Sequence, residues 1–563
     1  MSQSVAGILV DTLEKIGVRQ IFGLIADSLN PIGDVVRRSK IEWIGVRHEE
    51  GAALAAAGQA KLTGRLGVCC GSTGPGSNHL VAGLYEASRD HAPVLAISGD
   101  MPRQLAGIDY FQTTNPNMLF SDVSLYTETV SSPAQAPAVI HQAIAAAYAG
   151  RGVAHLTFPM DVLTSTVNGS VASLATLKPR PEIFPGEADI AEMARRIDEA
   201  GRIVIMCGAG CHGAAEELRA LSDRLKAPLI HSVKGKDIMP FDDPRWMGGI
   251  GMIGTKPNYH AVMHCDLFLM LGTDYPYSEF LPREGVVIQV DERARVIGRR
   301  TPTEFGVIGS VRPTLKSLLD RVKPKSDSGF FDRVTAERKV WDEKLDRQSD
   351  PARSKDRIHP QAVARAVSDL AARDAVFIID TGLNTLWSGN WIRQNGEQRI
   401  IGSFNNGAVG TALGQANGVQ ALDRSRQVIA LCGDGGFNML MCEFLTAVQH
   451  KLPVKAVVYN NSTLGLIRLE AESMGMPAWK AMDFPNPDYV ALARACGGIG
   501  FKAEKPGELR EAIDKALKAD GPAIVDCVVA ADELPNVPHL DLEKIGNFAK
   551  AKIKEAVLAV TGG

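Results

Sequence analysis

The sequence predicts an α/β protein made of three consecutive doubly wound domains, each built on a parallel β-sheet. Short apolar, β-branched runs alternate with longer segments of 3.6-residue periodicity, and Gly-rich turns join them, which is the pattern of βαβ units. Two charged, proline-containing stretches, 174–189 and 322–329, separate three such blocks. A chain of 563 residues has room for about three or four domains.

In each block, we expect the short apolar runs to form the strands. Strands are expected at 21–23, 66–70, 93–97 and 155–159 in the first block, from 202–206 onward in the second, and at 375–379, 427–431 and 454–459 in the third. We therefore place the domains at 1–173, 186–322 and 357–535, with a helical tail over 536–563.

Composition and charge exclude several classes of protein. The chain carries 61 basic and 64 acidic residues, a formal net charge of -3, so no overall positive field attracts nucleic acid. Its nine cysteines are odd in number and form no C-x-x-C pair, which indicates buried free thiols in a reducing compartment. No stretch reaches the ~18 apolar residues of a spanning helix, and the N-terminus lacks the basic region of a signal peptide. We expect a cytoplasmic protein.

The strongest chemical signal is Gly-Asp-Gly-Gly-Phe at 433–437, directly after an expected strand and before a periodic segment, 439–449, expected to be helical. Glycines permit a tight turn and close approach of a ligand, and a helix N-terminus favours an anion. Asn460 and Asn461 follow the next strand. A carboxylate and an amide oxygen at the carboxyl ends of adjacent parallel strands suit Mg2+ and a diphosphate. Either piece alone is more typical of a turn or a helix cap, so it is the pairing that favours a cation site.

These motifs resemble the thiamine diphosphate signature of the pyruvate oxidase and acetolactate synthase superfamily. The similarity is strongest to pyruvate oxidases of the bacterial quinone-linked type and extends along the chain, through the stretches 47–50, 71–80, 110–116, 272–277, 402–408 and 451–455. It implies a pyrimidine-binding, a central FAD-binding and a diphosphate-binding domain, in this order. It also implies that Asp434, Asn461 and the carbonyl of Thr463 hold Mg2+.

The resemblance assigns the other contacts with thiamine diphosphate to short loops. Val409 matches the apolar wedge that bends the cofactor, and Gly74 lies in the Gly-rich loop that lines it. The residues implied to contact thiamine diphosphate are Gly74, Asn406, Gly407, Ala408, Val409, Gly433, Asp434, Gly435, Gly436, Asn461, Thr463, Leu464, Gly465 and Leu466.

A second chemical element is Glu49. In the family, the glutamate of Arg-His-Glu hydrogen-bonds the aminopyrimidine, which then removes the proton from the thiazolium C2, and this position is Glu49 rather than Glu50. Taken alone, a Glu in a charged cluster is more typical of a solvated surface residue. Phe111 and Gln112 match the pair that faces substrate and complete the candidate catalytic residues, although a core aromatic under a loop is the alternative for Phe111. The resemblance also implies that Glu49 serves a cofactor bound by another subunit of a homodimer or dimer of dimers.

The middle block contains Gly-x-Gly-x-x-Gly at 208–213 between an expected strand and an expected helix. This fingerprint is weak alone, because helix–strand packing can require the same glycines. The resemblance strengthens it, since four stretches match the FAD contacts of the family and Asp291 is placed to bond a ribose hydroxyl. The implied FAD contacts are Gly208, Ala209, Gly210, Ile250, Gly251, Met252, Ile253, Thr273, Asp274, Tyr275, Pro276, Tyr277 and Asp291. Lys234, Ser310 and Leu466 replace an expected Arg, Asp and Phe.

The resemblance implies oxidative decarboxylation of pyruvate, or a close 2-oxo acid, to acetate and CO2, through a thiamine-bound enamine that FAD oxidises, with electrons passed to a quinone. Two alternatives stay open within the superfamily: a phosphate-dependent oxidase that uses oxygen and makes acetyl phosphate, and a non-oxidative, acetolactate-synthase-like carboligase or decarboxylase. A non-catalytic nucleotide-binding scaffold would explain the glycines of the middle block, but not the coexistence of Glu49, Asp434 and Asn461.

The last segment, 543–563, carries apolar residues at helical spacing with lysines nearby. A basic amphipathic helix can lie on a membrane surface, which would allow peripheral membrane contact. We favour a helix docked on the protein with its lysines in solvent. The positions concerned are Lys544, Ile545, Lys550, Lys552, Ile553, Lys554, Val557 and Val560.

Overall fold

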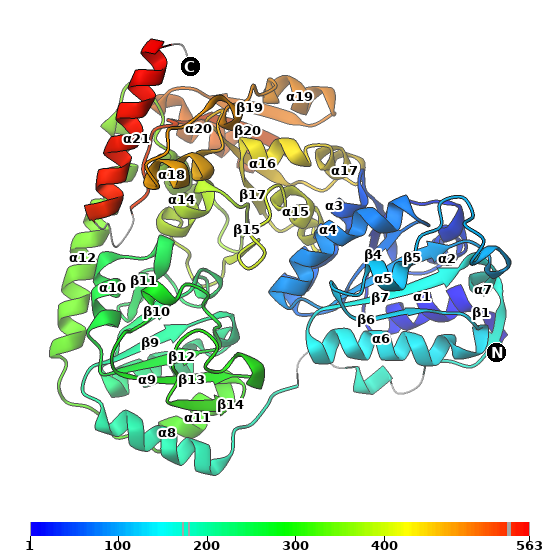
Figure 1. The fold of residues 1–563 in the computed structure, drawn as a ribbon, viewed down its shortest axis with the longest axis horizontal. Coiled ribbons are helices and arrows are strands. Elements are labelled where there is room, and N and C mark those ends of the chain that lie inside the picture. Colours follow the sequence, from blue (N-terminus) through cyan, green and yellow to red (C-terminus); the bar gives the residue numbers. More distant parts are fainter. Residues whose placement is uncertain (1, 172–173, 178, 180, 537–541, 562–563) are drawn as a thin grey trace.

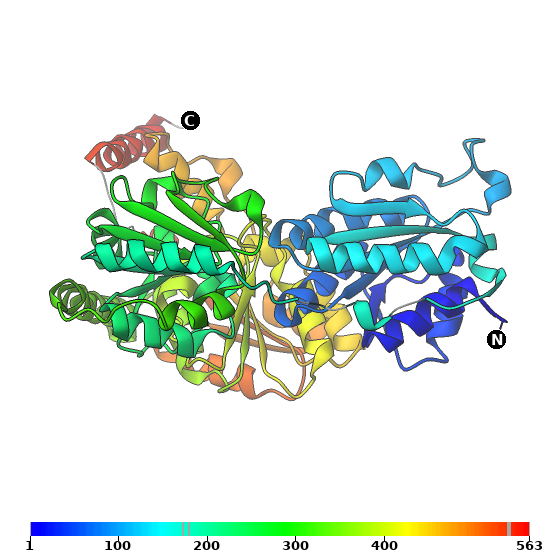
Figure 2. The same cartoon turned by 90° about the horizontal axis from the view of Figure 1, so that it is seen from below.

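A computed structural model of the chain contains three six-stranded parallel sheets, which confirms the predicted fold class. It describes residues 2–171, 174–177, 179, 181–536 and 542–561. Figure 1 shows the N-terminal domain on the right, the middle domain at the lower left and the C-terminal domain above it. Figure 2 shows helices on both sides of the N-terminal sheet, which explains why its central strands β4 and β7 are buried along their whole length.

The N-terminal sheet has the strand order β3-β2-β4-β5-β7-β6, and all of its pairs are parallel. Its strands are β2 (Gln20–Gly23), β3 (Glu42–Gly45), β4 (Gly67–Gly71), β5 (Val94–Asp100), β6 (Ser124–Thr129) and β7 (Val153–Pro159). Its helices are α1 (Val5–Lys15), α2 (Asn30–Val36), α3 (Glu49–Thr63), α4 (Pro75–Asp90), α5 (Pro116–Leu119), α6 (Ala136–Gly150) and α7 (Met160–Thr164). A separate antiparallel pair joins β1 (Ser2–Ser4) to β8 (Thr166–Asn168).

The C-terminal sheet repeats this topology. Its order is β16-β15-β17-β18-β20-β19, so with the strands of each sheet numbered in chain order both read 2-1-3-4-6-5. Its strands are β15 (Val376–Ile379), β16 (Arg399–Gly402), β17 (Val428–Gly433), β18 (Lys455–Asn460), β19 (Ile499–Ala503) and β20 (Ala523–Val528). Its helices are α13 (Pro360–Leu370), α14 (Leu383–Trp391), α15 (Ala412–Leu422), α16 (Asp434–Met439), α17 (Glu443–Gln449), α18 (Gly465–Ser473), α19 (Tyr489–Ala495) and α20 (Pro506–Lys518).

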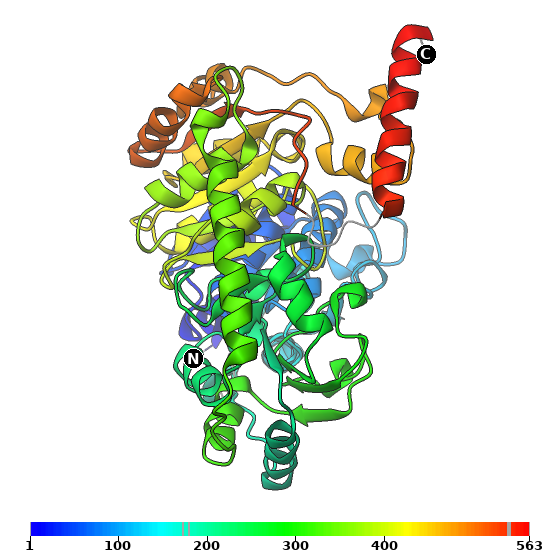
Figure 3. The same cartoon turned by 90° about the vertical axis from the view of Figure 1, so that its left-hand side faces the viewer.

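The middle sheet differs from the other two. Its order, β11-β10-β9-β12-β13-β14, reads 3-2-1-4-5-6 in chain order, which is the order of dinucleotide-binding sheets. Its strands are β9 (Ile203–Cys207), β10 (Leu229–His231), β11 (Trp246–Gly249), β12 (Leu267–Leu271), β13 (Val286–Asp291) and β14 (Phe305–Ile308). Its helices are α8 (Glu187–Glu199), α9 (Ala215–Leu225), α10 (Lys256–Met263) and α11 (Val311–Leu319). The long helix α12 (Gly329–Ser349) then runs from this domain to the C-terminal one, and α21 (Leu542–Thr561) lies at the edge of the molecule (Figure 3).

The N-terminal and C-terminal domains share one core through the pair α3 and α15. Helix α3 is rich in Ala and Gly and is buried along most of its length. A Cβ on Gly58 would lie 2.6 Å from the carbonyl oxygen of Gln415, and a Cβ on Gly418 would lie 2.0 Å from that of Ala55. The two backbones therefore approach as closely as glycine allows.

We expect Gly418→Ala to destabilise the protein. Ala gains up to about 1 kcal/mol of helix propensity over Gly, but its methyl group would meet a backbone oxygen of α3 that cannot rotate away. Overpacking of this kind costs about 1–3 kcal/mol, so the clash outweighs the propensity and the melting temperature falls. Gly507→Ala, on α20 with nothing within 4 Å of the added carbon, is the matched control. Equal melting temperatures for the two variants would contradict the expectation.

Candidate active site

Three loops of the C-terminal domain meet near the point where its strand order reverses, between β15 and β17. A Cβ on Gly410 would lie 3.2 Å from the carbonyl oxygen of Gly436, and one on Gly435 would lie 3.3 Å from Leu464. The loops and the helix starts that follow them contain all the residues of this domain expected to bind thiamine diphosphate, namely Asn406, Gly407, Ala408, Val409, Gly433, Asp434, Gly435, Gly436, Asn461, Thr463, Leu464, Gly465 and Leu466.

Asp434 is the first residue of α16 and is buried. Its Oδ2 accepts hydrogen bonds from the backbone N–H of Asn461 (3.0 Å) and from Nδ2 of Asn486 (2.8 Å), and its Oδ1 accepts one from the N–H of Gly435 (2.9 Å). Burial raises the pKa of Asp434, against the opposing effect of these hydrogen bonds. A cation beside the carboxylate would favour its charged form.

The donors at this edge fit the metal that the sequence suggests. Asp434 offers a carboxylate, Asn461 an amide oxygen and Thr463 a backbone carbonyl, so the set consists of oxygens, which a hard cation such as Mg2+ prefers. Val409 and Leu464 are each 40% exposed beside these groups. Two apolar side chains left open at a polar edge suit contact with the organic part of a ligand.

Asp380 also lies at the switch point, directly after β15, and sequence reasoning missed it. Its carboxylate accepts hydrogen bonds from the N–H groups of Thr381 (2.9 Å), Gly410 (3.0 Å) and Thr411 (3.1 Å). A Cβ on Gly436 would lie 2.5 Å from its Oδ2. Burial raises the pKa of Asp380 to about 7. Asp380 is thus hydrogen-bonded to the end of the 403–411 loop and lies against Gly436 of α16, the helix that Asp434 begins.

The prediction of one continuous helix over 439–449 is wrong. The chain forms α16, leaves helical geometry at Leu440 (φ −130°) and starts again at Glu443 as α17. The break coincides with a tertiary contact, because the Glu443 side chain is bonded to the N-terminal domain. The periodicity of a short segment cannot predict a contact with another domain.

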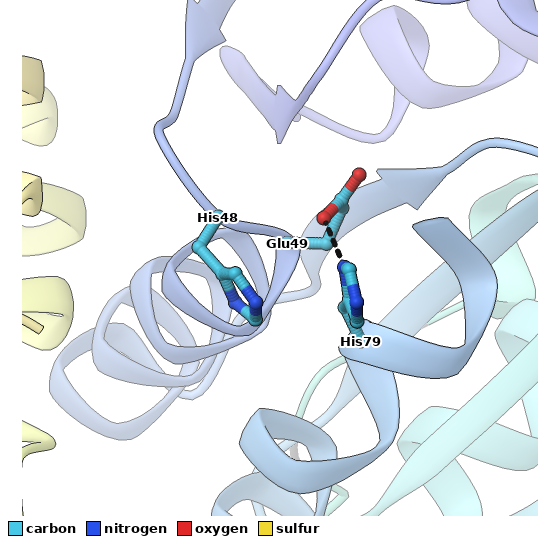
Figure 4. Close-up of side chains that lie close together, drawn as sticks. All are labelled: His48, Glu49 and His79. Atoms are coloured by element: carbon cyan, nitrogen blue, oxygen red, sulfur yellow. Dashed lines mark hydrogen bonds and ion pairs between the residues drawn. The ribbon is translucent and has the colours of Figure 1, made fainter. Parts of the chain in front are cut away.

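In the N-terminal domain, Glu49 begins α3 and is only 6% exposed, so its interpretation as a solvated surface residue is wrong. One carboxylate oxygen, Oε2, lies 2.9 Å from Nδ1 of His79, and the His79 ring stacks on that of His48 with centroids 4.5 Å apart (Figure 4). The possible ligand atoms of these three residues lie within 4.8 Å of one another, but the hydrogen bond to His79 already accounts for Glu49 and His79. His79 was missed, although it lies in the Gly-rich stretch 71–80.

Two loops lie next to Glu49. A Cβ on Gly76 would lie 3.0 Å from its Oε1, and one on Gly74, which has a positive φ of +63°, would lie 2.1 Å from the carbonyl oxygen of Gln112. Phe111 is 73% exposed, so a core position for its ring is wrong. The structure therefore brings together Glu49, Gly74, Phe111 and Gln112, the four predicted residues of this domain.

Among the described residues, no hydrogen bond joins these two groups of residues within one chain. The Glu49 side chain is hydrogen-bonded to His79, and Gly76 lies close to it, both in the N-terminal domain. Exposed apolar side chains flank both groups, namely Ile108, Tyr110, Phe111 and Met118 on one domain and Val409, Met439, Leu464 and Ile467 on the other. Exposed large apolar side chains beside polar groups are typical of an interaction site.

The middle domain places its predicted residues at one edge of the sheet. Gly208–Gly210, Ile250–Ile253, Thr273–Tyr277 and Asp291 follow or end the strands β9, β11, β12 and β13. A Cβ on Gly210 would lie 2.7 Å from Gly272 Cα, so packing between the turns after β9 and β12 already requires this glycine. These two strands flank the switch point, where dinucleotides bind in sheets of this order.

Several charged groups around this edge are suited to a dinucleotide, but Asp291 is already paired within the chain. Nη1 of Arg293 is buried without a hydrogen-bond partner, so its positively charged guanidinium has an N–H donor free for a ligand. The pKa of His91 is lowered to about 3, first by burial and then by four cations around it, Arg293, Lys234, Arg151 and Arg295. Asp291, expected to meet a ribose, instead accepts hydrogen bonds from Arg293, at 2.9 Å from its N–H and 3.1 Å from Nε.

Two of the three departures from the family pattern have partners in the structure. Lys234 donates to Oδ1 of Asp90 at 3.0 Å, which joins the middle and N-terminal domains. Ser310 Oγ accepts from the N–H of Ile183 (3.0 Å) and donates to Glu292 (2.7 Å). Leu466 lies in the first turn of α18, after the predicted metal loop.

Comparison with known proteins places these half-sites in a family. Three models of thiamine pyrophosphate enzymes match the chain, the N-terminal TPP binding domain at residues 3–119, the central domain at 190–318 and the C-terminal TPP binding domain at 380–527. The chain belongs to the pyruvate oxidase and acetolactate synthase group of thiamine pyrophosphate enzymes, which confirms the resemblance.

Full-length relatives carry more than one activity in their names. The protein YdaP of Bacillus subtilis is 34% identical over 98% of this chain and 96% of its own length. A pyruvate oxidase of Lactiplantibacillus plantarum is 32% identical, covering 93% and 88%. An acetolactate synthase large subunit of Parasynechococcus marenigrum is 31% identical, covering 95% and 89%. Identity alone therefore does not choose between the two reactions.

Helix α21 is docked on α18 in the part of the tail whose side chains are described. Lys552 pairs with Glu472 (2.8 Å), and Lys554 donates to the carbonyl of Gly475 (2.9 Å). These contacts favour the docked helix, and the side chains of Lys550, Lys552 and Lys554 are exposed, as expected for a lysine face in solvent. Lys544, Ile545, Val557 and Val560 lie outside the described side chains. Within the described residues, no helix is long and apolar enough to cross a membrane.

Proposed function

We propose that the protein oxidatively decarboxylates pyruvate, or a close 2-oxo acid, with water to acetate and CO2, using thiamine diphosphate, Mg2+ and FAD. One observation supports the oxidative part: the chain that carries two thiamine half-sites also carries a sheet in dinucleotide-binding order, with glycine turns at its switch point. The relative named pyruvate oxidase adds support. A quinone is the proposed electron acceptor, with oxygen and phosphate as the alternative.

Each half-site has a proposed role. Bound thiamine diphosphate supplies a carbon nucleophile and an electron sink, and bound FAD a two-electron acceptor. Asp434, Asn461 and the carbonyl of Thr463 would hold Mg2+. Glu49 would hold and move a proton at its carboxylate, which His79 orients through the 2.9 Å hydrogen bond. The exposed Phe111 and Gln112 would face substrate.

We infer that a second copy of the chain completes each site. Glu49 lies in one domain and Asp434 in another, and the exposed apolar side chains beside both suit coverage by a symmetric partner. A homodimer then contains two sites, each with Glu49 from one chain and Asp434 from the other. We also retain 1–173, 186–322 and 357–535 as the proposed limits of the pyrimidine-binding, FAD-binding and diphosphate-binding domains.

The visible spectrum tests the oxidative step. The protein is reconstituted with thiamine diphosphate, Mg2+ and FAD, and the flavin band is recorded before and after anaerobic addition of pyruvate. We expect the band to bleach and CO2 to be released. A flavin band that persists while CO2 is released would contradict the oxidase.

That second result would establish the other candidate, a non-oxidative carboligase or decarboxylase. Leu466 favours it, because an aromatic residue expected beside the cofactor is missing. The relative named acetolactate synthase covers the chain as fully as the oxidase does. Detection of acetolactate in the same reaction mixture separates a carboligase from a decarboxylase.

A further inference from the structure

A buried carboxylate of the C-terminal domain holds the segment that leads into Glu49. Glu443 is the first residue of α17, nine positions after Asp434, and is 1% exposed. Its Oε1 accepts hydrogen bonds from the backbone N–H groups of Arg47 (3.0 Å) and His48 (2.9 Å). Glu49 is the next residue and the first of α3.

The surroundings of Glu443 form a built socket. Its second carboxylate oxygen accepts a hydrogen bond from Oγ1 of Thr446 (2.7 Å), and its backbone carbonyl accepts one from Nδ2 of Asn417 (2.8 Å). A Cβ on Gly51 would lie 2.5 Å from the carboxyl carbon, so a larger residue there would displace the Glu443 side chain. An anion at the N-terminus of α3 is also favoured by the helix dipole. The hydrogen bonds from Arg47, His48 and Thr446 therefore fix the orientation of the Glu443 carboxylate.

We propose that Glu443 is a positioning residue for Glu49. The inference rests on the proposed role of Glu49, and it adds that Glu443 controls where the Glu49 carboxylate lies. Two backbone bonds fix the main chain at 47–48, and with it the direction in which the Glu49 carboxylate leaves α3. Misplacement of a reacting group by about 1 Å can cost about 100-fold in rate. Because Glu49 serves the site that holds the cofactor of the other chain, Glu443 connects the diphosphate half of its own site to the proton-transfer half of the neighbouring one.

Exchange of the thiamine C2 proton measures the step directly. We compare Glu443→Leu, which removes the acceptor, with Glu443→Gln, which keeps an acceptor oxygen, in the holoenzyme by NMR after quenched exchange into D2O. Glu443→Leu is expected to slow exchange by about 10- to 100-fold, and Glu443→Gln by less than about threefold, with unchanged affinity for thiamine diphosphate. Wild-type exchange in Glu443→Leu, or equal slowing in both variants, would overturn the proposal.

Two further variants keep the test decisive. If Glu443→Leu does not fold, Glu443→Asp shortens the side chain by one methylene and should also slow exchange, whereas unchanged exchange counts against the proposal. Glu49→Gln in the same assay tests the proposed function separately. Slow exchange in Glu49→Gln with normal exchange in the Glu443 variants rejects the role of Glu443 alone.

Hybrid dimers test which site Glu443 serves. In a dimer of one Glu443→Leu chain and one Asp434→Ala chain, both defects fall in the same site if Glu443 acts through Glu49, and the other site remains active. If Glu443 acts on the diphosphate half of its own chain, both sites are lost and the proposal fails. The hybrid of Glu49→Gln with Asp434→Ala is the reference, and its failure to recover would reject the shared site itself, while the exchange rates still judge Glu443.

Discussion

Glu49→Gln is expected to lower the rate of CO2 release from pyruvate by about 100- to 10,000-fold, the range that a positioned proton-transfer group contributes. Gln keeps the size of the side chain and an acceptor oxygen, but it does not take up a proton at neutral pH. Because Glu49 is buried with its carboxylate hydrogen-bonded to His79 and is not one of the residues proposed to hold Mg2+ or the diphosphate, the affinity for thiamine diphosphate should fall much less than the rate.

The neighbouring Glu50→Gln is the matched control. Both residues lie in the first turn of α3, so both changes alter its N-terminal charge equally, and Glu50→Gln should retain at least about half of the wild-type rate. Similar rates for the two variants would reject the assignment of Glu49 over Glu50. A non-catalytic nucleotide-binding scaffold would show no activity in any of the three proteins.

Asp434→Asn is expected to weaken Mg2+-dependent binding of thiamine diphosphate by at least about 100-fold, since even outer partners of metal ligands contribute about 10- to 100-fold. The amide keeps the shape of the side chain and its capacity to accept from Asn461, but it loses the charge that attracts the cation. Binding is measured by calorimetry with and without Mg2+. The Mg2+ dependence itself should shrink in the variant.

Asp526→Asn is the control for this change. Asp526 is a second buried carboxyl whose pKa burial raises, on strand β20, which pairs with β18, and it accepts a hydrogen bond from Nδ2 of Asn460 at 2.9 Å. Removing its charge should leave cofactor affinity within about threefold of wild type. An equal loss of affinity in both variants would show that general damage to this edge of the sheet, and not metal ligation, explains the effect.

The sequence was sufficient for the framework because parallel strands buried on both faces are apolar runs that Gly-rich turns interrupt. It also placed Asp434 and Asn461 correctly at adjacent strand ends, since the carboxyl ends of parallel strands share one edge. The partners that fix them come from elsewhere in the chain. Asn486, which binds Asp434, lies in a loop 52 positions away, and no local pattern marks it.

Contacts between domains were the harder part. Glu443 lies 395 positions from His48, and its bond to that residue coincides with the break between α16 and α17 that periodicity did not predict. Glu49 became recognisable as a buried group only once α3 was packed against α4 and α15. Asp380 carries a signal only in retrospect: it directly follows a strand and precedes a Thr-Gly pair, as the metal-motif aspartate precedes two glycines.

The N-terminal and C-terminal sheets share the strand order 2-1-3-4-6-5, so one chain contains the same topology twice, with different side chains in the loops. One copy carries Glu49, the acid proposed to move a proton, and the other carries the oxygens proposed to hold a cation. Since function resides in loops on a rigid framework, and since Phe111 is proposed to face substrate, we expect changes in its loop to alter which oxo acid is accepted more than they alter cofactor retention. Substrate range and cofactor affinity can therefore diverge independently in such a protein.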